Sequence, residues 1–163
     1  MTVRYALTWY WSLLVSFIAG FVSTLAFHQG LIWAVLKAGV SPGMAITPYN
    51  MEPVDPLGVP AVVSLAFWGG VWGIALWAMI KSLRPATQSI AAVIIGALGP
   101  TALALLVIFP HRGIAVSDEM WIAGGVLNAV WAVGTLSLVR VFMMLRPVRE
   151  TPFETNGPDD QQR

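Results

Sequence analysis

The sequence predicts an all-α integral membrane protein, a four-helix bundle with a proline-rich outward loop between its first and second helices. Of 163 residues, 57% are apolar and only 10% are charged, whereas soluble domains carry about 25% charged residues. Four long stretches lack charge or nearly so, which is typical of helices in lipid. Between the first two lies the connector, residues 41–60, with prolines at 42, 48, 53, 56 and 60. That proline density excludes a regular helix.

The first predicted span covers about residues 8–36, because residues 5–36 contain no charged side chain. A bilayer core needs about 20 residues, so tilt, an aromatic belt at the interface or a break near Gly30 must absorb the surplus. We do not expect a signal peptide, because the apolar run far exceeds the roughly 7–15 residues of a signal core.

The other three spans are predicted at about 59–80, 89–109 and 120–145. The second ends at a basic helix stop, and Pro100 is expected to kink the third. Asp118 and Glu119 suit the positive end of the helix dipole where the fourth span begins. Residues 1–149 thus form one four-span domain, and the polar residues 150–163 are predicted to be a disordered cytoplasmic tail.

Orientation follows from the distribution of basic residues, because cytoplasmic loops are rich in Lys and Arg. One side of the predicted membrane collects six of them: Arg4, Lys81, Arg84, Arg140, Arg146 and Arg149. The other side has only Lys37 and Arg112, together with four carboxylates. Both termini are therefore predicted to be cytoplasmic, with the connector and the loop around His111 facing outward.

Small residues indicate how the spans pack, because helices in lipid associate where their backbones approach closely. Gly69 and Gly73 form a GxxxG pattern in the second span, and Gly124 and Asn128 share a face of the fourth. We expect these four residues at helix contacts. The amide of Asn128 should bond to another helix, because an unpaired amide in lipid is costly.

The candidate functional residues are polar and lie on the outward side: His28, Gln29, Tyr49, Glu52, Asp55 and His111. Histidine in an uncharged run needs a partner. We expect the connector to fold back over the helix ends and to supply that partner from Glu52, Asp55 or a backbone carbonyl. The alternative is that His28 merely caps the connector.

No catalytic or cofactor site is predicted. Cysteine is absent, so disulfides and thiolate metal sites are excluded. Phosphate loops, zinc-protease motifs and serine-hydrolase motifs are also missing. Ligation of haem or metal by the two histidines has no recognised spacing in its favour. The net charge of +1 gives no indication of a nucleic-acid partner.

Two segments carry a resemblance to a known group: Phe27-His28-Gln29-Gly30 with the proline-rich run that follows, and Ala66-Phe67-Trp68-Gly69-Gly70-Val71-Trp72-Gly73. They resemble a group of small four-span bacterial inner-membrane proteins to which no activity is assigned. The resemblance implies the bacterial cytoplasmic membrane and the four-span fold, but no function. Similar endings of alternate spans also leave open a duplicated helical hairpin.

Three functions from different classes remain open. The favoured one is a non-enzymatic accessory or interaction subunit, with the lipid bilayer, a second copy or another membrane protein as its partner. It would bind through its glycine faces and its connector. The alternatives are a small oligomeric transporter or channel, and a haem- or quinone-associated redox subunit.

Overall fold

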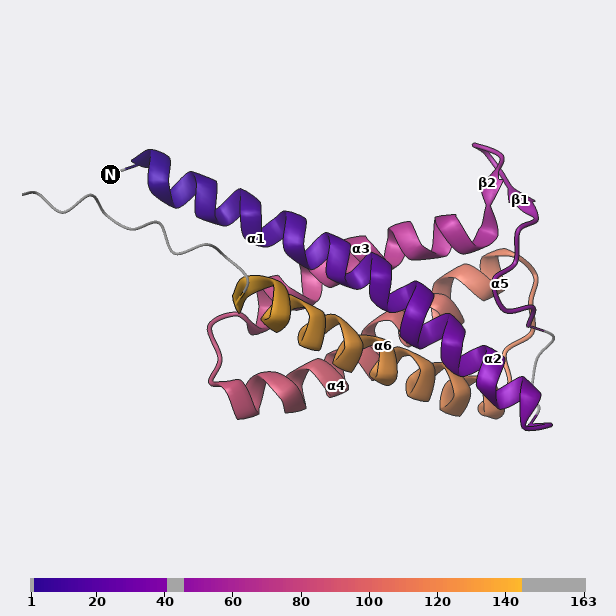
Figure 1. Cartoon of the computed structure of the whole chain (residues 1–163). Helices are drawn as coiled ribbons and strands as arrows, with labels where there is room; N and C mark the ends of the chain where they lie inside the picture. The colour runs from indigo at the N-terminus through magenta and orange to yellow at the C-terminus, as the bar shows by residue number, and fades with distance from the viewer. Residues whose placement is uncertain (1, 41–45, 145–163) are drawn as a thin grey trace, which may run out of the picture.

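The computed structural model describes residues 2–40 and 46–144, with side chains from residue 9 onward. This part of the chain is all-α apart from one short pair of strands (Figure 1). Four helical stretches are long and apolar enough to cross a membrane: Trp9–Lys37, Ala61–Ile80, Pro85–His111 and Asp118–Met144. The tail predicted to be disordered, 150–163, lies outside the described residues.

The first long helix does not break at Gly30. Helix α1 (Thr2–Ser23) continues through a π-helical stretch, η1 (Thr24–His28), into α2 (Gln29–Lys37). A π stretch adds one residue to a helical turn and leaves backbone groups without their usual partners. The irregularity therefore lies just before Gly30, and the helical backbone continues beyond it.

The connector ends in a small β-hairpin. Strand β1 (Pro53–Val54) pairs antiparallel with β2 (Val59–Pro60), and Gly58 adopts a φ of +64° in the turn between them. A positive φ is open to glycine at little cost. Helix α3 (Ala61–Ile80) begins two residues later than predicted, because Val59 and Pro60 belong to the strand.

The second half of the chain consists of α4 (Pro85–Leu103), a π-helical stretch η2 (Ala104–Ile108), α5 (Phe109–His111) and α6 (Asp118–Met144). Helix α4 begins four residues before its predicted start, with Pro85 in its first turn. Proline suits that place because its φ is already helical and the amide it lacks has no partner there. Pro100 lies inside α4, and the π-helical turns follow it.

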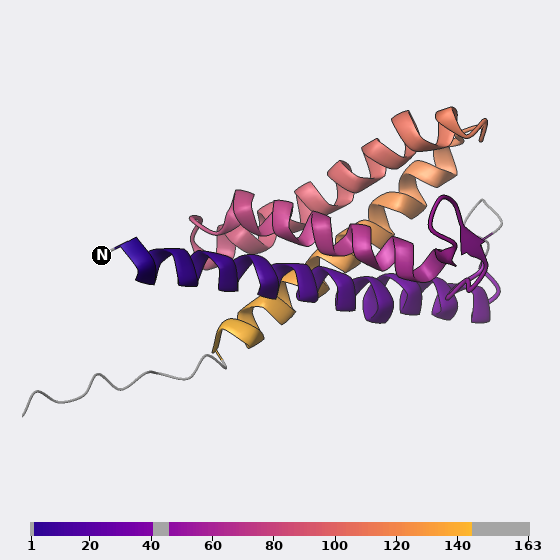
Figure 2. The same ribbon diagram turned by 90° about the horizontal axis from the view of Figure 1, so that it is seen from above.

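The helices form two antiparallel hairpins that cross each other. In the first hairpin α1 packs on α3, in the second α4 packs on α6, and α1 crosses α6 where the hairpins meet. Figure 2 shows the hairpins diverging from that crossing toward the end that carries β1, β2 and α5, which we call the connector end. The core lies along the crossing and includes Leu76, Ile80, Trp131, Leu136 and Val139.

Two buried hydrogen bonds join α1 to α6 at the crossing. The hydroxyl of Ser23 donates to the carbonyl of Trp131 at 2.6 Å, and the indole Nε1–H of Trp131 donates to the carbonyl of Gly20 at 3.1 Å. Ser23 is fully buried and Trp131 is 3% exposed. Each helix thus both donates to and accepts from the other in an environment where an unmade hydrogen bond is costly.

Candidate site at the connector end

Tyr49 attaches the connector to the first long helix. Its backbone N–H donates to Gln29 Oε1 at 2.8 Å, and its hydroxyl donates to the carbonyl of Leu25 at 3.0 Å. Leu25 lies in the π-helical stretch η1, where a helix leaves a carbonyl open to an outside donor. The irregular turn therefore supplies the acceptor, and Gln29, only 4% exposed, supplies the second attachment.

The backbone around Tyr49 is held on both sides. Tyr49 has a φ of +53°, which is uncommon for a bulky residue and costs about 1–3 kcal/mol unless its surroundings fix it. The side chain of Asn50 accepts the N–H of Glu52 at 2.8 Å, and the carbonyl of Asn50 accepts the N–H of Val62 at 2.9 Å. The connector is thereby bonded to α2 through Tyr49 and to the start of α3 through Asn50.

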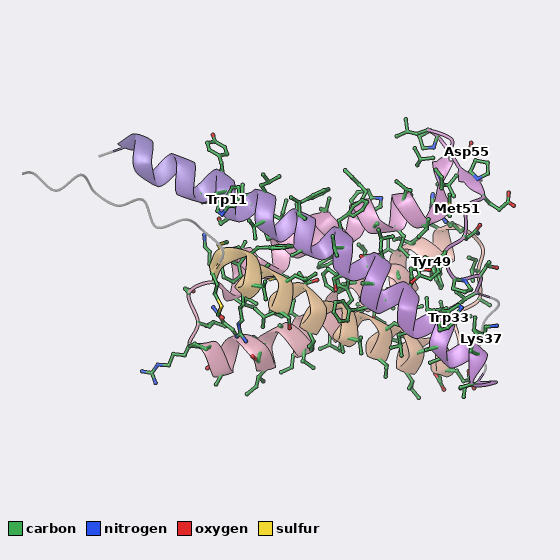
Figure 3. The ribbon with its side chains drawn as sticks, viewed as in Figure 1. Trp11, Trp33, Lys37, Tyr49, Met51 and Asp55 are labelled. Atoms are coloured by element: carbon green, nitrogen blue, oxygen red, sulfur yellow. The ribbon has the colours of Figure 1, made fainter. Side chains whose placement is uncertain are left out.

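The two carboxylates predicted as partners of His28 do not bond to it. Its Nδ1 lies 3.4 Å from Gln29 Nε2, and within the described part of the chain neither Glu52 nor Asp55 forms a hydrogen bond with it through a side chain. The reason is that Asp55 lies in the turn of the β-hairpin and Glu52 immediately before its first strand, and both residues are exposed. Figure 3 shows Asp55 on the projecting hairpin, while Tyr49 takes the position next to the first helix.

The structure therefore assembles only part of the predicted polar site. His28, Gln29 and Tyr49 lie together, whereas His111 ends α5 on the other hairpin and is exposed. The ends of α2 and α5 diverge (Figure 2), so the two histidines belong to different arms of the molecule. Among the described residues no group of three or more His, Cys, Asp or Glu side chains is placed to hold a metal ion.

The glycines of the predicted GxxxG pattern face α1. A Cβ built on Gly69 would overlap the Thr24 hydroxyl, and one on Gly73 would overlap the carbonyl oxygen of Ser16. Gly20 on α1 completes this contact, because a Cβ there would overlap the Gly69 carbonyl. The close approach of α1 and α3 depends on all three, and this glycine face is occupied within the chain.

Gly124 and Asn128 lie where α6 meets α4. The Asn128 amide donates to Thr101 Oγ1 at 2.9 Å, which is the interhelical hydrogen bond expected for an amide in the middle of a span. A Cβ on Gly124 would lie 3.0 Å from Thr101 Cγ2. Thr101 is therefore the shared contact of both residues, and this second small-residue face is also used inside the molecule.

Sequence reasoning does not identify Trp131 as a contact between helices, and it does not identify the groove that lies beside the crossing of α1 and α6. Trp131 was not singled out, because an indole inside an apolar helix looks like any other lipid-facing aromatic. The groove lies between α2 and the start of α6 and is lined mainly by aliphatic side chains. Only Glu119, a carboxylate on the first turn of α6, would have drawn attention to that end of the groove.

Comparison with known proteins adds no relative: no family model, no curated protein and no solved structure matches the chain.

Tyr49→Phe should loosen the connector. The substitution removes the hydroxyl that donates to the carbonyl of Leu25 and keeps the aromatic ring of residue 49. One hydrogen bond contributes about 1 kcal/mol, so backbone amides near Tyr49 should exchange with deuterium about fivefold faster. Tyr10→Phe, at a residue 65% exposed, is the control and should leave the connector unchanged. Equal exchange rates in Tyr49→Phe and the wild type would contradict the attachment described above.

Gly73→Ala should destabilise the protein by about 1–3 kcal/mol, because the added methyl group meets the backbone of α1. Gly125→Ala is the matched control on α6, since the nearest atom to its added Cβ lies 4.0 Å away; alanine there should be neutral or stabilising by up to about 1 kcal/mol. Thermal unfolding in detergent measures both. Similar unfolding temperatures for the two variants would show that Gly73 is not at a close contact.

Proposed function

We propose that the protein is a non-catalytic interaction subunit of the bacterial cytoplasmic membrane, with four spans packed as a bundle and both termini cytoplasmic. The four long apolar helices support the membrane placement. The charge distribution supports the orientation, because Lys81, Arg84 and Arg140 lie at the end opposite the connector. In this orientation the connector end faces outward.

Polar side chains inside the described helices serve the structure, which supports a non-catalytic role. Ser23, Thr24 and Thr135 donate to backbone carbonyls, and Asn128 donates to Thr101. Arg140 on α6 donates to the carbonyl of Pro85, to Gln88 and to Ser89 on α4. The transporter and redox alternatives gain no comparable support from the residues described.

The observation that carries the proposal is the fixed, exposed hairpin of the connector. Met51 is 67% exposed and Leu57 is 80% exposed, and both lie beside the exposed carboxylates of Glu52 and Asp55. Because Tyr49 and Asn50 hold the hairpin on the helices, a partner would meet these groups without first ordering the segment. Preorganisation of this kind lowers the entropic cost of binding. Of the two surfaces predicted to bind a partner, the glycine faces are occupied internally, which leaves the connector.

The orientation is tested with topology reporters fused after Arg84, after Arg149 and near Asn50. The first two fusions should report the cytoplasm and the third the external side, because basic residues are retained on the cytoplasmic side. Fusions after Gly113 provide a further external point. An external signal after Arg84 would overturn the proposed orientation.

The interaction role is tested by a photo-crosslinking amino acid at Leu57 in intact cells. We expect a discrete protein adduct that weakens when Glu52 and Asp55 are both changed to Lys, because the acidic groups flank the apolar contact. The same crosslinker at Ile90, an exposed residue on α4, is the control and should give no such adduct. Adducts only with lipid at Leu57, or an adduct unaffected by charge reversal, would count against the connector as a recognition surface.

A further inference from the structure

The two hairpins enclose a groove of about 330 Å³ between α2 and the first half of α6. Its walls come from both arms of the molecule: Leu31, Ile32, Val35, Val40, Glu119, Ile122, Ala123, Val126 and Leu127. It exists because α1 and α6 meet at Trp131 and then diverge toward the connector end (Figure 2).

The groove has one polar end and one apolar end. Glu119 and Val40 lie at the connector end, and Leu31 and Leu127 lie nearer the crossing. From Glu119 to Leu127 the groove follows α6 for about 12 Å, at a helical rise of about 1.5 Å per residue. Among the described residues that line the groove, Glu119 alone is ionisable. A fitting occupant is therefore a slender apolar chain that carries a cationic group at its outer end.

We propose that this groove binds one acyl chain of a phospholipid with an ammonium head group, such as phosphatidylethanolamine, and that the ammonium pairs with Glu119. The inference rests on the proposed membrane placement, which puts the open side of the groove in lipid. Small-molecule sites are commonly about 300–1,000 Å³, so the volume suits such a chain.

Two opposite charges complement a zwitterionic head group: Glu119 in the lining, on α6, and Lys37 outside the lining at the end of α2 (Figure 3). The carboxylate attracts the ammonium, while the lysine on the opposite arm attracts the phosphate. An anionic lipid with an uncharged alcohol head group would keep the contact with Lys37 and lose the one with Glu119. The groove should therefore select between lipids that carry the same acyl chains.

Selection is measured by native mass spectrometry of the full chain released from nanodiscs. The nanodiscs contain equal amounts of phosphatidylethanolamine and phosphatidylglycerol with identical acyl chains. The wild type should retain the ethanolamine lipid about three- to fivefold over the other, the scale of one partly exposed ion pair. Glu119→Gln should bring the two lipids to near-equal retention. Asp118→Asn is the control, since Asp118 precedes Glu119 but does not line the groove.

A second variant tests the groove by its volume. Ala123→Trp should fill it and abolish retention of either lipid, whereas Val133→Trp, on an exposed part of α6 outside the groove, should not. Equal retention of both lipids by the wild type, or an unchanged preference in Glu119→Gln, would overturn the lipid site. Detection of a lipid-free dimer of the protein, in place of a lipid-bound monomer, would also overturn the lipid site. Failure of the protein to enter nanodiscs would overturn the proposed membrane placement together with the lipid site. The outcomes above, by contrast, would overturn the lipid site alone.

Discussion

The carbonyl oxygen of Gly20 is the point on which the arrangement of the helices depends. It accepts hydrogen bonds from Trp131 Nε1 on α6 and from Thr24 Oγ1 on its own helix, at 3.1 and 2.9 Å. The Cα of Gly20 also lies in the contact with Gly69 and Gly73 on α3. Three helices therefore meet at one residue that has no side chain. Any larger residue at this place would separate α1 from α3 and disturb the hydrogen bond to Trp131.

The crossing at Gly20 has consequences at the connector end. Helices that meet at an angle diverge on either side of the contact, so the two hairpins lie apart where the connector and α5 are placed (Figure 2). At this end of the first hairpin the connector packs against the helix, because Tyr49 bonds to Gln29 and to Leu25 in the π-helical stretch. Between the arms remains the groove that ends at Glu119. The features assigned to binding thus lie away from the crossing, while the polar groups at the crossing hold the helices together.

The positions of the long helices and one of their packing faces could be predicted from short stretches of the sequence. Uncharged runs bounded by Pro85 and by the acidic pair at 118–119 located the long helices to within a few residues, and the GxxxG pattern indicated the face of α3 that meets α1. Contacts between distant segments were not predictable. The sequence wrongly favours Glu52 and Asp55 as partners of His28, because nothing in it shows that residues 53–60 form a hairpin, with Asp55 in its turn and Glu52 next to its first strand. The groove depends on a crossing angle, which no single residue encodes.

The central claim is that the contact of Trp131 with Gly20 and Ser23 sets the separation of the two arms. The chain has no cysteine, so spin labels at Lys37→Cys and Ile114→Cys report the distance between α2 and the loop after α5 by double electron–electron resonance. With Trp131 intact we expect one narrow distance distribution. In Trp131→Ala the distribution should shift and broaden, because the indole hydrogen bond to Gly20 and the packing of the ring are lost, although the backbone carbonyl that accepts from Ser23 remains. An unchanged, narrow distribution in Trp131→Ala would contradict the account.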